Sequence, residues 1–212
     1  HLENKGLISH KGTIVDATFV DAPRQRNSRD ENKKIKNGVI PEEWEKPENK
    51  SKLAQKDIDA DWTKKNGERH FGYKDHVKCD ADSKLITNYS VTSASVHDSQ
   101  RCLVFIGQED EVLYADSAYS GKPIALALPE NCKNQICEKG YRNSPLTSEQ
   151  KMNNRRKSRI RCRIEHIFGF MTGAMHGITI RSIGITRAWM NIGITNLVYN
   201  FCRYSYLKRA SA

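Results

Sequence analysis

Residues 12–20 read GTIVDATFV, an apolar run rich in β-branched residues with Asp16 at its centre. This composition predicts a β-strand. A second apolar run, EVLYA at residues 111–115, predicts a short buried strand, and it ends at another aspartate, Asp116. We therefore expect two strands that each carry one carboxylate, far apart in sequence.

A third carboxylate follows a strongly basic segment. Residues 151–163, KMNNRRKSRIRCR, contain seven Lys or Arg and no acidic residue, and Glu165 follows in the apolar stretch IEHIFGFM. Thr147, with Gln150 three residues later, has the pattern of a helix capping box, which predicts one long helix from Thr147 to about Met171. Arg161 lies one helical turn before Glu165, where it could hold a phosphate next to that carboxylate.

The order of predicted elements indicates the fold. The strand at 12–20 is followed by a polar segment, two strands that can pair antiparallel (70–79 and 84–92), and then alternating helices and strands up to a last helix at about 185–207. This order predicts an α/β protein with a mixed sheet flanked by helices, as in the ribonuclease H-like fold. We interpret residues 1–212 as one catalytic domain and residues 22–68 as a polar insertion after the first strand. The insertion is either a flexible loop or a segment docked through its tryptophans.

In that fold the first and fourth strands are neighbours and the long helix covers the sheet near them, so Asp16, Asp116 and Glu165 would converge. Three carboxylates in one place repel each other unless cations compensate, and oxygen ligands suit Mg²⁺ or Mn²⁺. Two such ions can activate a water or a 3′-hydroxyl at a phosphodiester. Taken singly, each residue has a simpler interpretation: a turn or cap for each aspartate, and an ion pair within a solvated helix for the glutamate.

Composition favours a nucleic-acid partner. The net charge is +10 and 37% of the residues are hydrophobic, with a pI near 9.3; such a basic balance points to nucleic acid or, less directly, to an anionic membrane surface. Arg and Asn residues interrupt the apolar stretch at 178–207, which argues against a membrane span. The six cysteines show no CxxC spacing, which argues against a zinc site or a disulfide framework and fits a reducing cytosol.

Several motifs, in this order, resemble those of the DDE transposases of bacterial insertion sequences, the IS-five-type group in particular. The stretches are VDATFVDAP (15–23), QRNSRDEN (25–32), QKDIDADWTKKNGERHFGYKDH (55–76), VTSASVHDS (91–99), YADSAYSG (114–121) and RCRIEHIFGFM (161–171). The resemblance implies that Asp16, Asp116 and Glu165 form the catalytic triad and bind two divalent metal ions. It also implies cleavage of transposon ends and strand transfer into target DNA, in a bacterial cytoplasmic protein associated with the nucleoid.

The sequence departs from this family at one place. Related transposases carry a Tyr, an Arg, the Glu and a Lys at positions that correspond here to Ser158, Arg161, Glu165 and Thr172. The Arg and Glu match, whereas the Tyr and the Lys do not, so other basic side chains would have to hold the DNA. The predicted DNA contacts are Arg155, Lys157, Arg159, Arg161, Lys74, Arg24 and Arg26.

The sequence therefore predicts a metal-dependent DNA transposase that acts on double-stranded DNA, as a homodimer when assembled on it, and without a membrane partner. Two other hypotheses stay open: a ribonuclease H-like nuclease without strand transfer, and an inactive, transposase-derived DNA-binding protein. A glycosidase is disfavoured by the basic surface and the lack of an aromatic sugar platform. We also expect that the N-terminal DNA-binding region of full-length members is absent from this chain.

Overall fold

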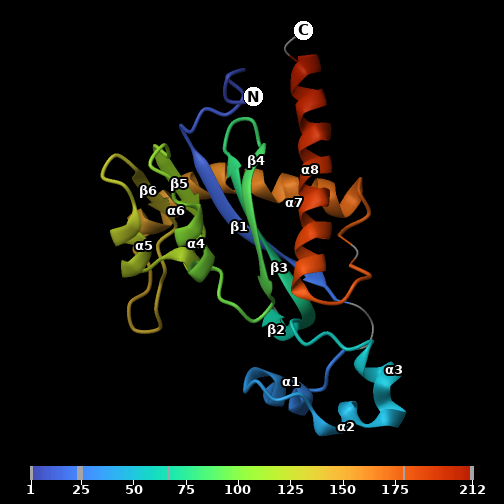
Figure 1. The fold of residues 1–212 in the computed structure, drawn as a ribbon. Coiled ribbons are helices and arrows are strands. Elements are labelled where there is room, and N and C mark those ends of the chain that lie inside the picture. Colours follow the sequence, from blue (N-terminus) through green and yellow to red (C-terminus); the bar gives the residue numbers. More distant parts are fainter. Residues whose placement is uncertain (1, 23–25, 66, 179, 211–212) are drawn as a thin grey trace.

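The computed structural model describes residues 2–22, 26–65, 67–178 and 180–210, and its centre is one six-stranded mixed sheet (Figure 1). The strands are β1 (Thr13–Asp21), β2 (Asp61–Lys65), β3 (Glu68–Asp80), β4 (Ile86–Ser93), β5 (Val112–Ala115) and β6 (Lys133–Ile136). β3 is antiparallel to β1, β2 and β4, whereas β1, β5 and β6 run parallel. The order β2-β3-β1-β5-β6, with β4 also on β3, confirms the predicted ribonuclease H-like mixed sheet.

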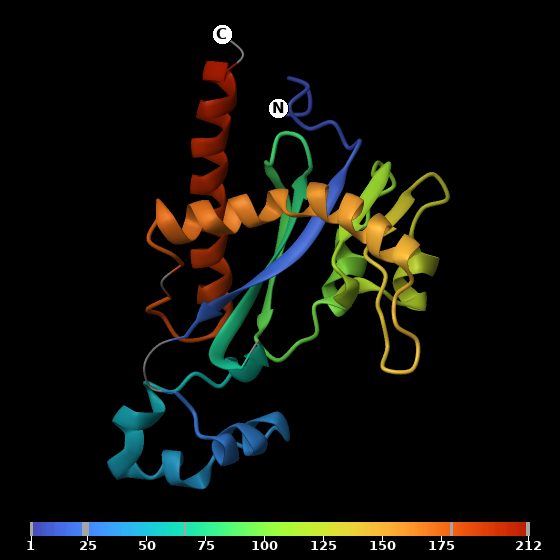
Figure 2. The same ribbon diagram turned by 180° about the vertical axis from the view of Figure 1, so that it is seen from behind.

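Helices cover both faces of this sheet. One face holds α7 (Arg163–Gly173), which continues α6 (Ser148–Arg161), and α8 (Ile185–Ala210), as Figure 2 shows. The other face holds α4 (Ser99–Phe105) and α5 (Lys122–Ala127). Successive side chains of a strand point to opposite faces: Ile14 packs with the α7 residues and Val15 with those of α4 and α5. The apolar run around Asp16 is therefore buried on both sides.

The long basic helix begins as predicted but is interrupted. Thr147 caps α6, and its capping box with Gln150 is complete. The prediction of one continuous helix to Met171 is wrong, because Cys162 (φ −59°, ψ −10°) separates α6 from α7. The interruption separates two different surfaces: α6 has no buried residue among its members, whereas α7 buries Ile164, Ile167 and Met171 against the sheet.

The polar insertion is folded where the structure describes it. It contains α1 (Arg29–Lys36), α2 (Glu42–Glu45), a 3₁₀ turn (Pro47–Asn49) and α3 (Lys50–Leu53), and then β2, which the sequence did not predict. These helices form a small lobe beside the end of β3 that pairs with β2 (Figures 1 and 2). Trp44 is fully buried and its indole N–H donates to Glu31 at 2.9 Å. Of the two interpretations left open, the docked segment is the one observed.

The last helix follows the prediction for 185–207 and extends it to Ala210. Its buried residues are Ala188, Ile192, Asn196 and Tyr199, which recur with helical spacing and face β3 and β4. Across the described ranges, no helix has both the length and the apolar character that a membrane crossing requires.

Candidate active site

Asp16, within β1, and Asp116, directly after β5, lie on neighbouring parallel strands. The β1–β5 ladder pairs Thr13 with Leu113 and Ile14 with Tyr114, and the same register continued by two residues brings Asp16 level with Asp116. Asp16 accepts a hydrogen bond from the Ala17 amide at 2.8 Å. Asp116 caps a short 3₁₀ turn (Ser117–Tyr119) by accepting from the Ala118 amide at 2.7 Å. Each carboxylate is thus oriented by its own backbone.

Arg161 connects Glu165 to Asp16 through two hydrogen bonds. The Arg161 guanidinium, at the end of α6, donates to Asp16 Oδ2 and to Glu165 Oε1, each at 2.9 Å. The pair with Glu165 is the expected ion pair across one helical turn. The pair with Asp16 joins positions that are 145 residues apart, and no spacing in the sequence indicated it. Arg161 therefore links the long basic helix to the central strand.

The electrostatics show that these groups influence one another. Burial raises the pKa of the Asp16 carboxyl to about 6; the Ala17 amide opposes this effect, and the negative charge of Asp116 adds to it. Burial alone would lower the pKa of the Arg161 guanidinium, but Asp16, Glu165 and Asp116 together raise it above its ordinary value. All three carboxylates therefore act on one cation.

This arrangement fits a divalent metal in its donor chemistry. Carboxylate oxygens are the ligands that Mg²⁺ and Mn²⁺ prefer, and the Arg161 guanidinium already stands as a cation between two of them. Three carboxylate side chains and one guanidinium leave an excess negative charge that a metal ion could neutralise. The structure brings Asp16 and Glu165 to the same guanidinium; their role as metal ligands stays a prediction.

Another group of potential ligands lies at the opposite, starting end of β1 and β5. In the described ranges, His10, Glu109 and Asp110 are the one set of His, Cys, Asp or Glu residues whose ligand atoms all lie within 4.8 Å of one another. However, buried Lys78 donates to Asp110 Oδ2 at 2.8 Å, and Thr13 donates to the other oxygen at 2.6 Å. Because a lysine already neutralises Asp110, we interpret this group as a structural ion-pair network.

The two lysines predicted to contact DNA form hydrogen bonds within the protein, whereas two of the predicted arginines are exposed. Lys74 is buried and donates to the Val96 carbonyl and to Asp98, at 2.7 and 2.8 Å. Lys157 donates to the Ile136 carbonyl at 2.9 Å. Both ammonium groups thus have partners within the protein. The buried Lys74 has a structural role, because it links its strand to the segment at Val96 and Asp98. By contrast, the exposed Arg155 and Arg159 line a shallow hollow on α6.

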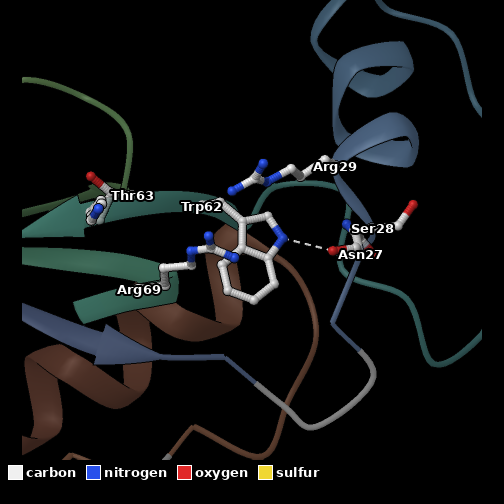
Figure 3. A pocket seen from close by; sticks show the side chains of 7 residues that line it. Asn27, Ser28, Arg29, Trp62, Thr63 and Arg69 are labelled. Atoms are coloured by element: carbon white, nitrogen blue, oxygen red, sulfur yellow. Dashed lines mark hydrogen bonds between the residues drawn. The ribbon is translucent and has the colours of Figure 1, made fainter. Parts of the chain in front are cut away.

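The insertion contributes a second basic surface. Arg24 lies outside the described residues, and Arg26 is exposed, with its guanidinium 5.7 Å from the centre of the Trp62 ring. Trp62 itself donates to the Asn27 carbonyl at 2.6 Å. Together with Arg29 and Arg69, its indole lines a pocket of about 350 Å³ between the lobe and the sheet (Figure 3).

Comparison with known families identifies the chain. The family model described as "Transposase DDE domain" matches residues 8–201, nearly the whole sequence. The chain belongs to the DDE transposase family. Transposases of this family generally use divalent metals, which agrees with the donor chemistry of the site.

A solved transposase structure resembles this fold distantly. The cryo-EM structure of the piggyBac transposase synaptic complex with hairpin DNA shares 12% sequence identity with this chain, at a TM-score of 0.45. That similarity covers 92% of this chain but only 47% of the other, so this chain spans about half the length of that transposase.

Thr172, at the position where the resemblance predicted a lysine, has an internal role. Thr172 lies on α7, and its hydroxyl donates to the Phe168 carbonyl one turn earlier at 2.8 Å. It also lines a hollow together with Thr18 and His70. The position thus faces the far end of β1, but it offers no positive charge to a phosphate.

Proposed function

We propose that this protein is a metal-dependent DNA transposase of the IS-five-type group, which cleaves transposon ends and transfers the cut strand into target DNA. The observation that supports this most is the bridge by Arg161 between Asp16 on β1 and Glu165 on α7, with Asp116 acting on both Asp16 and Arg161. Carboxylates from two separate elements thus share one guanidinium, and the charge of a third carboxylate acts on it, which supports a site that attracts cations.

We assign Asp16, Asp116 and Glu165 as the residues that would hold two Mg²⁺ or Mn²⁺ ions. Such ions, when bound, supply a nucleophile at neutral pH and stabilise the charge on the attacking and leaving oxygens. Asp16 and Asp116 are each fixed by one backbone hydrogen bond. The second oxygen of Asp16 accepts from Arg161 and would have to exchange that partner for a metal ion. Glu165 is more exposed and completes the second site from the helix.

Arg161 would have two roles in this scheme. Without metal its guanidinium neutralises Asp16 and Glu165. If Asp16 and Glu165 held metal ions, the Arg161 guanidinium would be free next to the site, and a DNA phosphate is the anion it would then bind. Arg161 thereby keeps the carboxylates together before DNA arrives and positions the scissile phosphate afterwards.

The rest of the DNA surface would be built around this site. We propose that exposed Arg155 and Arg159 contact the DNA backbone along α6, and that Arg26 does so from the lobe. In this proposal residues 22–68 are an insertion within a catalytic domain that spans the chain, and two copies assemble on paired DNA ends. Phosphate contacts of this kind give affinity that decreases with salt.

The test is a cleavage and joining assay on DNA that carries the inverted repeats of the element's own locus, with Mn²⁺ and a target duplex. Wild-type protein should give nicked ends and joined products, and Asp116→Asn should give neither. Asp82→Asn, which neutralises an exposed carboxylate outside the site, is the matched control and should leave both products. Nicks without joined products would favour the nuclease, and salt-sensitive binding without nicks would favour the inactive DNA-binding protein.

A further inference from the structure

The helix α8 is apolar on two opposite faces. Its inner face is buried against the sheet by Ala188, Ile192 and Tyr199. At about 100° of rotation per residue, a second apolar row lies about 180° from that face. The members of this outer row are between 42% and 62% exposed; they are Met190, Ile194, Leu197, Val198 and Phe201. A surface helix of a soluble monomer normally turns a polar face outward, so the outer row requires a separate explanation.

The spacing of the outer row is that of a helix–helix seam. Met190, Ile194, Leu197 and Phe201 are separated by four, three and four positions, which is the alternation of apolar residues that packs two helices against each other. The row is also long enough for two-helix packing, since it spans three helical turns at about 5.4 Å per turn. Figure 1 shows α8 at one side of the molecule, and none of the other described helices or strands covers its outer face.

From this geometry we propose that α8 is a self-association surface, on which the α8 helix of a second copy of this chain packs antiparallel. The row is self-complementary in that direction. Met190 would pack against the partner subunit's Phe201, and Ile194 against the partner subunit's Leu197, around a two-fold axis between residues 195 and 196. A two-fold interface of this kind uses the same patch on both copies.

Charge determines the antiparallel direction. α8 contains no acidic residue, and its four basic residues lie outside the row. Arg187 precedes it, Arg203 donates to the Ser83 carbonyl at 2.7 Å on the inner side of the helix, and Lys208 and Arg209 follow it in the last turn. A parallel pair would bring the cations of both copies together. The antiparallel pair moves Lys208 and Arg209 beyond the start of the partner helix and leaves an uncharged seam.

The exposed area is sufficient for such an interface. Aromatic side chains bury roughly 150–250 Å² each and aliphatic ones less, so these five, about half exposed, offer on the order of 300–400 Å². A standard interface buries about 800 Å² per partner, of which about 60% is apolar. The outer row alone therefore supplies most of the apolar area that one partner of a dimer needs. This association requires no DNA, so it goes beyond assembly on paired ends.

The test is the molar mass of the intact chain without DNA, measured by sedimentation at increasing concentration. We expect a reversible dimer at micromolar concentration. Leu197→Lys should weaken it by about tenfold or more, because each copy would bury an unpaired charge in the seam. Leu126→Lys is the matched control: Leu126 is 85% exposed on α5, and its substitution should leave dimerisation unchanged. Circular dichroism should show the same helix content for both variants, so that a loss of dimerisation is not due to unfolding.

A disulfide experiment tests the direction. In a background with Cys202→Ser, Ile194→Cys protein and Leu197→Cys protein should cross-link to each other when mixed and oxidised, and each should cross-link poorly to itself. Cross-linking of each variant to itself would contradict the antiparallel arrangement. A protein that stays monomeric at every concentration would overturn the proposal, as would a monomer that binds anionic vesicles through Leu197.

Discussion

A buried carboxyl group on β3 makes the stability of this fold depend on pH. Asp75 is fully buried, and burial raises its pKa from 3.8 to about 7, although a hydrogen bond from the Asn196 amide opposes this. That amide, on α8, donates to Asp75 Oδ1 at 3.3 Å. Asp75 Oδ2 and Asn196 Oδ1 have no partner in the structure. A proton on Oδ2 would let it donate to Asn196 Oδ1 and would complete a two-bond pair.

The direction of the pH effect follows from the raised pKa. The folded state binds the Asp75 proton more tightly than the unfolded state, so this group favours folding most below pH 3.8, and the advantage is lost as pH rises through about 7. About three pKa units at about 1.4 kcal/mol each correspond to about 4 kcal/mol. Asp75→Asn replaces the carboxyl with a neutral amide that can donate to Asn196 at any pH. We therefore expect it to stabilise the protein by up to about 4 kcal/mol at pH 9 and to have little effect near pH 4.

Urea unfolding of both proteins between about pH 3 and pH 9 measures this difference. Asp80→Asn is a control for which we expect the opposite effect on the free energy of unfolding. Burial acts to raise the pKa of Asp80, but hydrogen bonds from Ser83 and Ser9 hold it below its ordinary value. Asp80→Asn should therefore destabilise the protein most at neutral pH, and less as pH falls below 3.8. An Asp75→Asn protein that is less stable than wild type at pH 9 would refute the account of this pair.

Two further substitutions test the central sheet. Lys78→Met should lower the free energy of unfolding by about 3–5 kcal/mol, because it leaves Asp110 charged and buried without its 2.8 Å partner; a loss below about 1 kcal/mol in urea unfolding would contradict this. Gly72→Ala should cost more than about 3 kcal/mol, because a Cβ there would overlap the Val20 carbonyl oxygen across the β1–β3 ladder. A Gly72→Ala protein with an unchanged melting temperature would show that the two strands separate easily at this point.

The sequence predicted those parts of the fold that depend on local chemistry. Apolar runs located β1 and β5 with their aspartates, and the capping box at Thr147 located the start of α6, because strands and caps are specified by neighbouring residues. The strand β2 was missed because DWTKK, at Asp61–Lys65, is polar and belongs to the sheet only through pairing with β3.

The sequence did not predict the long-range contacts. Arg161 was expected to hold phosphate, but nothing in its neighbourhood indicated that Asp16 would accept its hydrogen bond. Lys74 was predicted to contact DNA from its place on the strand at 70–79. Only the folded chain shows that Asp98 binds its ammonium group at 2.8 Å. Burial decides which cations are free, and burial depends on the whole fold.

The central claim is that Asp16, Asp116 and Glu165 hold the metal, and Mn²⁺ binding measured by electron paramagnetic resonance tests it most directly. The wild-type chain should bind Mn²⁺, and Asp116→Asn should lose at least one bound ion. Glu109→Gln, which alters the other group of clustered ligands, should bind as the wild type does. If Glu109→Gln abolished Mn²⁺ binding while Asp116→Asn preserved it, the metal would belong to the start of the sheet, and the proposed active site would be wrong.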